Sequence, residues 1–474
     1  MRGIFPMGLL SDLTLTDSGF HPYLNTGTLF DIQTGVFVPG DHGGMVLNGG
    51  LTTTNAVVGR EQMFKSTELF SYVIQAMLRY PLSECYVYDT EYSLKKDRLI
   101  HFAQALDYKA FDERMIIQTP ADLSAGEWFA NIKKIHAYKI ANAKDYMVES
   151  PLLDPRTGKR LKVWIPTFVV VDSWSVFSSE QVQEVMDTKV LGSSDTNMIF
   201  MKDGIIKKMM LSQIPKMAAT AGIYFMLSAH VGNKFELNPY APSNKSLPLM
   251  KSTDKPKTVG SEFNFLMSNY IQMHSVSPLI ESKEPIYPLE GSGDSELNEV
   301  VSIMLRCKNN MSGTLLRMVV SQRDGILPDM SNYHYLRKND YFGLIGNSRE
   351  HKPAMTDIVL SRGTVRAKLN DQTNPGNPKL GHALELIAQL SYIQDNWAGN
   401  TAGDVDFSMK PKVLAEKLLA SDGPTTDDIL SSRSWWTYDK TNTQPYMSLY
   451  DVLAIAQGVY KAKGISMAQP KTKK

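Results

Sequence analysis

This chain contains few cysteines, no long apolar run and almost no net charge. Its 474 residues include two cysteines, Cys85 and Cys307, which excludes a disulfide scaffold and a cysteine-rich zinc site. No stretch approaches the roughly 18 continuous apolar residues of a membrane span, and the start lacks the basic-then-apolar pattern of a signal peptide. Lys and Arg number 50 and Asp and Glu 49, so any basic surface must be local. We expect a soluble cytoplasmic protein with no membrane contact.

Residues 59–67 (GREQMFKST) have the spacing of a phosphate-binding loop, Gly-x-x-x-x-Gly-Lys-Ser, except that Phe64 occupies the second glycine position. Backbone N–H groups of such a loop surround nucleotide phosphates, Lys65 reaches the β and γ oxygens, and the Ser66 hydroxyl binds Mg²⁺. Residues 66–79 then place apolar side chains on one face of an expected helix. The loop alone also fits an ordinary strand–turn–helix. With the helix after it, a nucleoside triphosphate becomes the first candidate ligand.

Four short apolar runs are typical of strands buried on both faces: Gly44–Asn48, Cys85–Tyr88, Thr167–Val171 and Ile223–Leu227. Their alternation with helical stretches predicts a parallel sheet with right-handed crossovers. On this assignment, residues 51–58 are an insertion between the first strand and the phosphate loop. The Pro- and Gly-containing segment before residue 166 predicts an inserted hairpin or loop.

The pattern changes after residue 300. Two strands are expected at Val300–Cys307 and Thr314–Val320, and helices through Tyr333–Leu336, 380–395, 411–420 and 448–462. We therefore expect an α/β fold in three parts: an N-terminal segment (1–30), a core with a mostly parallel sheet (31–345), and a smaller, mainly helical C-terminal domain with a basic tail (346–474).

Polar residues follow the expected strands at the edge where α/β proteins bind ligands. Glu91 comes after the second strand, Asp172 after the third and His230 after the fourth. Asp172 suits a carboxylate on the Mg²⁺ side, Glu91 could deprotonate an attacking water, and His230 could sense the γ-phosphate. Each also has a simpler explanation: a turn cap for Asp172, a solvated acid for Glu91, a structural histidine for His230.

At this point the sequence resembles the RecA/RadA recombinase family, and most closely the UvsX-like recombinases of phages. The similar runs are Phe64-Lys65-Ser66, 85–91 (CYVYDTE), 170–173 (VVDS), Ser228-Ala229-His230 and 306–310 (RCKNN). The resemblance covers roughly residues 20–345 and implies a RecA-like P-loop ATPase core. No clear counterpart of the family's adenine-stacking aromatic lies near Arg98.

The resemblance also implies roles for individual residues. ATP and Mg²⁺ would be the ligands. The ATP contacts would be Gly59, Phe64, Lys65, Ser66 and Thr67, together with Lys308 reaching the ATP of a neighbouring protomer. Ser66 and Asp172 would hold the metal, and Lys65, Glu91 and His230 would act in catalysis. Residues 1–30 would contact another protomer.

Family members bind single-stranded DNA with two mobile loops, whose counterparts here would be residues 190–207 and 233–262. The expected DNA contacts are Lys202, Lys245, Lys251, Lys255 and Lys257. Lysines neutralise phosphates without reading sequence, although solvated loop charges would need no such role.

The implied function is a DNA-dependent ATPase that forms filaments on single-stranded DNA. It would promote homologous pairing and strand exchange with double-stranded DNA in phage recombination, repair and replication, in the host cytoplasm. A phage mediator and a single-strand-binding protein are the further expected partners. Two alternatives stay open: a RecA-core replicative helicase, and a structural DNA-binding filament with an inactive nucleotide site. Phe64 and the 51–58 insertion would favour the second.

Overall fold

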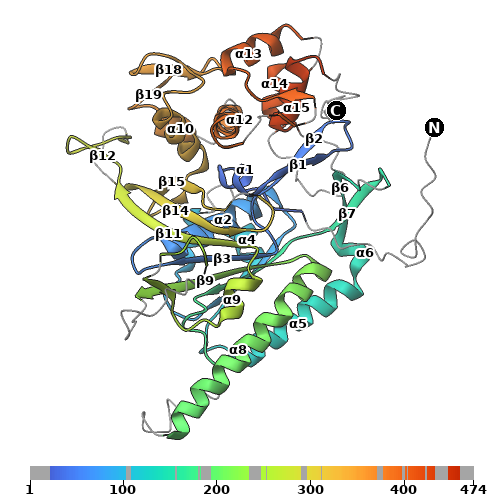
Figure 1. Ribbon diagram of the computed structural model, residues 1–474, viewed down its shortest axis with the longest axis vertical. Coiled ribbons are helices and arrows are strands. Elements are labelled where there is room, and N and C mark those ends of the chain that lie inside the picture. Colours follow the sequence, from blue (N-terminus) through green and yellow to red (C-terminus); the bar gives the residue numbers. More distant parts are fainter. Residues whose placement is uncertain are drawn as a thin grey trace.

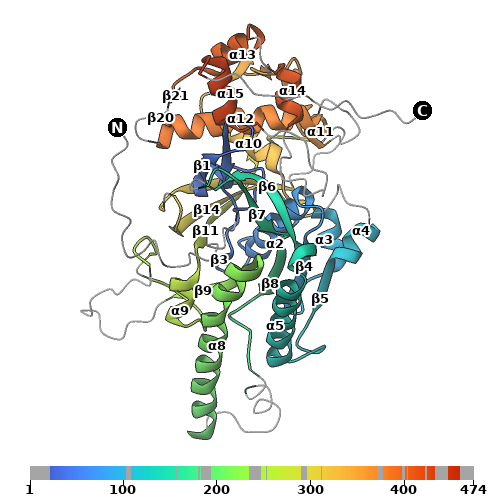
Figure 2. The ribbon, with the colours of Figure 1, turned by 90° about the vertical axis from the view of Figure 1, so that its right-hand side faces the viewer.

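The computed structural model describes residues 22–102, 108–154, 157–179, 182, 194–233, 247–251, 253–289, 296–310, 312–370, 377–397, 401–402, 404–421, 424–432 and 447–459. Helices α12 to α15 lie at one end of the molecule and α5 and α8 at the other, with a large sheet between them (Figures 1 and 2). No helix in these ranges is both long enough and apolar enough to span a bilayer.

The central sheet consists of β3 (Thr54–Gly59), β4 (Glu84–Asp89), β5 (Met115–Gln118), β8 (Thr167–Asp172), β9 (Ile223–Asn233), β10 (Asp254–Pro256), β11 (Asn269–Pro278), β14 (Leu297–Cys307), β15 (Leu315–Ser321) and β16 (Gly325–Ile326). Among the described residues the order is β16-β15-β14-β11-β3-β9-β8-β4-β5, and β10 pairs with the end of β9. Neighbouring strands from β11 to β5 are parallel, whereas β14, β15 and β16 are antiparallel. The expected α/β fold with a mostly parallel sheet and helical regions is confirmed.

The described helices are α1 (Phe30–Thr34), α2 (Lys65–Arg79), α3 (Lys96–Phe102), α4 (Tyr108–Arg114), α5 (Ala125–Ala141), α6 (Ala143–Tyr146), α8 (Ser194–Ala221), α9 (Ser261–Leu266), α10 (Pro328–Lys338), α11 (Val365–Asn370), α12 (Asn377–Asn396), α13 (Pro411–Leu419), α14 (Thr426–Ser431) and α15 (Leu449–Ala456). Smaller sheets pair β1 (Val36–Pro39) with β2 (Met45–Asn48), β6 (Met147–Leu153) with β7 (Arg160–Trp164), β12 (Ile280–Glu281) with β13 (Glu284–Pro285), and β20 (Thr401–Ala402) with β21 (Val405–Asp406). Strands β17 (Leu344–Gly346), β18 (Glu350–Pro353) and β19 (Leu360–Ser361) form another.

Alternate residues of the parallel strands enter two separate apolar clusters. In β8, Phe168 and Val170 belong to the cluster on one face of the sheet, and Val169 and Val171 to the cluster on the other. Helix α2 buries its apolar side in the first cluster, and α5 and α8 contribute to the second. Two-sided burial explains why these strands are apolar throughout rather than alternating.

The first expected strand is present, but its expected place in the central sheet is wrong. Residues Met45–Asn48 form β2, which pairs with β1 outside the central sheet. The strand that leads into the phosphate loop is β3, so residues 51–58 are not an insertion. The polar residue Asn55 interrupts the apolar pattern of this strand in the sequence. Its side chain is nevertheless fully buried, and its amide donates hydrogen bonds to the carbonyls of Thr52 and Phe225. A buried polar group satisfied in this way fits a central strand.

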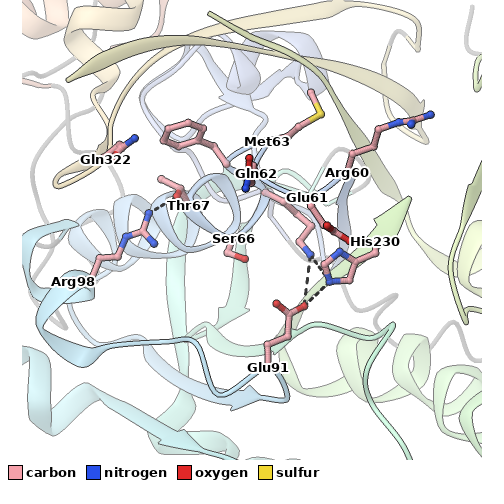
Figure 3. A pocket seen from close by; sticks show the side chains of 12 residues that line it. Arg60, Glu61, Gln62, Met63, Ser66, Thr67, Glu91, Arg98, His230 and Gln322 are labelled. Carbon is pink, nitrogen blue, oxygen red and sulfur yellow. Dashed lines mark hydrogen bonds and ion pairs between the residues drawn. The ribbon is translucent and has the colours of Figure 1, made fainter. Parts of the chain in front are cut away.

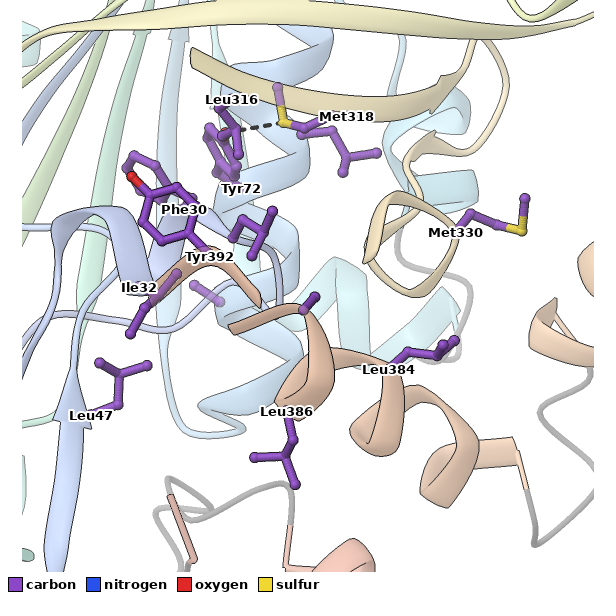
Figure 4. Packing of buried hydrophobic residues seen from close by; sticks show 14 of the residues in the cluster. Phe30, Ile32, Leu47, Tyr72, Leu316, Met318, Met330, Leu384, Leu386 and Tyr392 are labelled. Atoms are coloured by element: carbon purple, nitrogen blue, oxygen red, sulfur yellow. Dashed lines mark hydrogen bonds between the residues drawn. The ribbon is translucent and has the colours of Figure 1, made fainter. Parts of the chain in front are cut away.

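The C-terminal helices pack on the same apolar cluster as the sheet. Tyr72 of α2 and Leu384 of α12 belong to one continuous cluster, which also contains Phe30 and Met318 (Figure 4). The expected hairpin is present as β6 and β7, and α12, α13 and α15 lie where helices were expected. The boundary at residue 345 stays a prediction.

A polar contact attaches α15 to the turn between β1 and β2. The ring of His42 lies 3.0 Å from Asp451, whose other oxygen accepts the N–H of Met45 at 2.8 Å. Burial lowers the pKa of His42, but hydrogen bonds and charges from Asp41 and Asp451 outweigh it and raise the pKa to about 9. His42 is therefore a cation at neutral pH and forms a buried ion pair.

Candidate active site

In the loop between β3 and α2, Phe64 adopts a backbone conformation that suits the glycine usual at this position. Phe64 has φ 60° and ψ 19°, in the left-handed region that glycine enters freely. An ordinary residue loses about 1–2 kcal/mol there. The Phe64 ring packs, half-buried, against the main apolar cluster, which offsets part of that loss. Gly59 is required for another reason, because a Cβ there would lie 2.6 Å from Met273 on β11.

The first turn of α2 faces a cavity. Phe64, at the helix N-cap, provides no side-chain hydrogen bond, so the first N–H groups of α2 keep their capacity to bind an anion. The cavity has a volume of about 830 Å³ (Figure 3). Its lining residues are Arg60, Glu61, Gln62, Met63, Phe64, Lys65, Ser66, Thr67, Glu91, Arg98, His230 and Gln322.

Three predicted residues meet in this cavity. His230 Nε2 lies 2.7 Å from Glu91 Oε1, and Lys65 Nζ lies 3.8 Å from the same oxygen (Figure 3). A carboxylate only accepts hydrogen bonds, so Nε2 carries the proton and donates it. Lys65 Nζ and His230 Nε2 lie 3.3 Å apart, and because both are donors they do not bond each other but share Glu91 Oε1 as their acceptor.

The surroundings of Glu91 keep it ionised. The hydrogen bond from His230 lowers its pKa most, burial opposes this, and the charge of Lys65 lowers it further, to about 2. The neighbouring acid, Asp89, has a different role. Its carboxylate accepts the backbone N–H groups of Glu91 at 3.1 Å and Leu94 at 2.8 Å, which fixes the turn after β4. Glu91, not Asp89, therefore faces the cavity.

Asp172 ends β8 and is buried beside the loop. Its carboxyl accepts a hydrogen bond from Ser228 Oγ. Burial raises the pKa of Asp172, while the charge of Lys65 and the hydroxyls of Ser228 and Ser66 counteract it. Among the described residues, no group of three or more His, Cys, Asp and Glu side chains could hold a metal without help. Ser66 and Asp172 nevertheless fit Mg²⁺, which takes one or two protein oxygens beside nucleotide phosphates.

Two lining residues carried no signal in the sequence. Arg98, on α3, donates to Thr67 Oγ1 at 2.7 Å, and its guanidinium lies 5.5 Å from the centre of the Phe102 ring. Gln322 comes from the turn after β15. Figure 3 shows Arg98 and Gln322 on the side of the loop away from Glu91 and His230. Only the folded sheet brings these segments to the loop.

Lys308 lies at the opposite end of the sheet from the loop. Its N–H donates to Ser268 O at 3.1 Å, and Ser268 donates to Thr54 O at 2.9 Å, at the start of β3. Because β3 is about 20 Å long, Lys308 is outside its own chain's cavity. Burial lowers the pKa of Lys308, and Arg306 lowers it further. Any contact of Lys308 with a nucleotide in such a cavity would have to be made in another copy of the chain.

The predicted DNA loops differ from expectation. Residues 194–207, where the first loop was expected, belong to the long helix α8, on which Lys202 is exposed. The second expected loop contains β10, because residues Asp254–Pro256 pair with the end of β9. Lys251, Lys255 and Lys257 are exposed, whereas Lys245 lies outside the described residues. Lys257 Nζ is 3.9 Å from Glu61 Oε1, so this lysine lies beside the phosphate loop.

Comparison with known proteins gives little further guidance. No protein-family model matches the chain, and no curated protein matches it either. Among solved structures, a crystal structure of the RadB recombinase matches with 15% sequence identity and a TM-score of 0.35, covering 64% of this chain and 98% of the other. A likeness of that size does not assign the chemistry of the cavity, which rests on its own geometry.

Proposed function

We propose that this chain is a DNA-dependent ATPase of the RecA/RadA recombinase type, similar to the UvsX-like phage recombinases. One observation carries the proposal: Lys65, Glu91 and His230 line one cavity at the carboxyl edge of four adjacent parallel strands, and Asp172 is buried beside Lys65 and Ser66 at the same edge. Ligands of open α/β sheets bind at this edge. A cation, two acids and a helix N-terminus are the parts that phosphoryl transfer needs.

In this proposal the helix N-terminus and Lys65 hold the phosphates of ATP, and Glu91 takes a proton from the attacking water. A carboxylate whose pKa is about 2 is a weak base. Phosphate oxygens would attract Lys65 and the His230 N–H away from Glu91. Its pKa would then rise, so binding of the substrate itself would activate the base.

Ser66 and Asp172 are the residues that would hold Mg²⁺. The ion would neutralise phosphate charge that the single ammonium of Lys65 cannot balance alone. Burial of Asp172 supports this role, because a buried carboxyl with a raised pKa gains from a nearby divalent cation.

Binding of DNA and of other copies of the chain completes the proposal. The exposed Lys202, Lys251, Lys255 and Lys257 would contact DNA phosphates. Lys308, remote from its own cavity, would reach the nucleotide of a neighbouring protomer, and residues 1–30 would contribute to that interface. Filaments of this kind would promote strand exchange in phage recombination, repair and replication, in the host cytoplasm. A mediator and a single-strand-binding protein would assist.

The test combines ATP turnover with electron microscopy of the full chain. Single-stranded DNA should stimulate turnover, and ATP with DNA should produce helical filaments. Closed rings would favour the helicase instead. Filaments without turnover would mean an inactive nucleotide site, and the absence of nucleotide binding would refute the proposal.

A further inference from the structure

Arg60, the first residue after β3 in the phosphate loop, contacts the segment that carries three of the proposed DNA-binding lysines. Arg60 directs its guanidinium away from Glu91 (Figure 3). One of its terminal nitrogens lies 2.9 Å from Asp254 Oδ1 and 2.9 Å from Asn233 Oδ1. Asp254 begins β10, and Asn233 ends β9. The loop and β10 are therefore joined by a direct ion pair.

Asp254 is the more buried partner of this ion pair and depends on it more strongly. Its side chain is 4% exposed, whereas that of Arg60 is 50% exposed. The second oxygen accepts a hydrogen bond at 2.8 Å from Gln272 on β11, the strand beside β3. Removing the cation from a buried carboxylate costs much more than losing an exposed ion pair. A shift of Arg60 would therefore pull Asp254 with it.

The other end of the same segment contacts His230. The N–H of Lys257 donates to His230 O at 2.7 Å. Ser175 Oγ accepts the N–H of His230 at 2.9 Å and donates to Lys257 O at 2.8 Å. Residues 253–257 thus contact two residues that line the cavity, Arg60 of the loop and His230, the histidine that bonds Glu91. The backbone N–H of Asp254 also donates to Lys251 O at 3.0 Å, which continues the connection to another exposed lysine.

We propose that the Arg60–Asp254 pair couples the nucleotide cavity to residues 251–257. Both are positioning residues, and the inference rests on the proposed function. A nucleotide that reshapes the loop moves Arg60 and, through Asp254, the lysines of β10. By thermodynamic linkage, DNA that fixes β10 in turn favours one arrangement of the loop. DNA-stimulated turnover passes through this pair, and basal turnover does not.

The first test is Asp254→Asn in the full chain. Asparagine keeps the size and one acceptor but removes the charge. Stimulation of turnover by single-stranded DNA should fall at least about fivefold, while basal turnover and the KM for ATP without DNA change less than about threefold. Lys109→Gln, which removes the exposed Lys109–Glu113 pair on α4, is the matched control and should change neither quantity. Wild-type stimulation in Asp254→Asn would overturn the inference, as would loss of basal turnover, which means a purely structural role.

A second test asks whether the two residues act as one unit. The double variant with Arg60→Gln and Asp254→Asn should lose no more stimulation by DNA than the more affected single variant, because each substitution removes the same contact. Multiplying effects would show that the residues act separately and would refute the coupling.

A third readout needs no DNA and separates failure of this inference from failure of the proposed function. Addition of ATP with Mg²⁺ should slow amide hydrogen exchange at residues 253–257 in the wild type and not in Arg60→Gln. This result in a chain that DNA does not stimulate would retain the coupling and refute the DNA role. An equal response in the variant, or no response in a wild-type chain that binds ATP, would overturn the coupling.

Discussion

Two cavities of nearly equal size show what distinguishes the candidate site. The cavity at the phosphate loop measures about 830 Å³, and a second one, between β18, α13 and α14, measures about 870 Å³. In the second, Lys352 pairs with Asp357 and Lys379 with Asp427, and the acids are 98% and 77% exposed. Solvent screens such pairs, whereas Lys65 is 6% exposed beside Glu91. The candidate site is therefore distinguished by charged side chains that come together at strand ends, and not by the volume of its cavity.

Substituting one lysine in each cavity should give the largest difference in ATP turnover between the two cavities. Lys65→Ala removes the cation beside the phosphoryl group, so ATP turnover should fall by at least about 10²–10³-fold, on top of weaker binding. Lys412→Ala, in the second cavity, should leave turnover unchanged. Steady-state phosphate release measures both. Normal turnover in Lys65→Ala would show that the loop is not the site.

Substitution of the acid in the first cavity should have the next largest effect. Glu91→Gln keeps the size and removes the base, so turnover should slow by about 10²–10⁴-fold while ATP still binds. Filaments formed with ATP should consequently persist. Single-turnover hydrolysis and microscopy over time measure these two effects. If Glu91→Gln hydrolyses normally and Asp89→Asn does not, the wrong acid has been assigned.

His42 tests whether a perturbed pKa outside the cavity affects stability instead of chemistry. Its folded pKa of about 9 exceeds the ordinary 6.5, so the stabilisation is complete below pH 6.5 and is lost as pH rises through 9. The shift corresponds to about 3 kcal/mol. The difference in unfolding free energy between wild type and His42→Gln should therefore shrink by about that amount from pH 6 to pH 10. Denaturant titrations measure it, and a constant difference would contradict the ion pair.

Phe64 should show the smallest effect, because two opposing contributions nearly cancel. Phe64→Gly relieves about 1–2 kcal/mol of left-handed strain and loses the packing of the ring. The KM for ATP should change less than about threefold, and the unfolding free energy by about 1 kcal/mol or less. Phe64→Val is the informative control, since a β-branched residue tolerates this conformation badly. If glycine disrupts binding and valine does not, the account of the loop is wrong.

The sequence predicted the candidate residues that follow local patterns and missed those that strand pairing brings together. Lys65 was identified from the spacing of the phosphate-binding motif, and Glu91, Asp172 and His230 each come after an apolar run, patterns that are visible without a structure. The central strand β3 was missed because the buried Asn55 interrupts its apolar pattern, and only hydrogen bonds across the sheet make it acceptable there.

The connection between loop and β10 was equally invisible. Arg60 and Asp254 are 194 residues apart, and the antiparallel pairing of β10 with the end of β9 brings them together. Lys257 lies beside Glu61 of the loop for the same reason. Ion pairs set by strand register leave no periodic signal in a single sequence.

Calorimetric titration with ATP and Mg²⁺, without DNA, tests the central claim most directly, because it asks which cavity binds the nucleotide. Wild type and Lys412→Ala should bind with the same affinity, and Lys65→Ala should bind at least about tenfold more weakly, a difference of 1.4 kcal/mol. Unchanged binding in Lys65→Ala, or binding lost in Lys412→Ala, would contradict the assignment of the cavity at the end of β3.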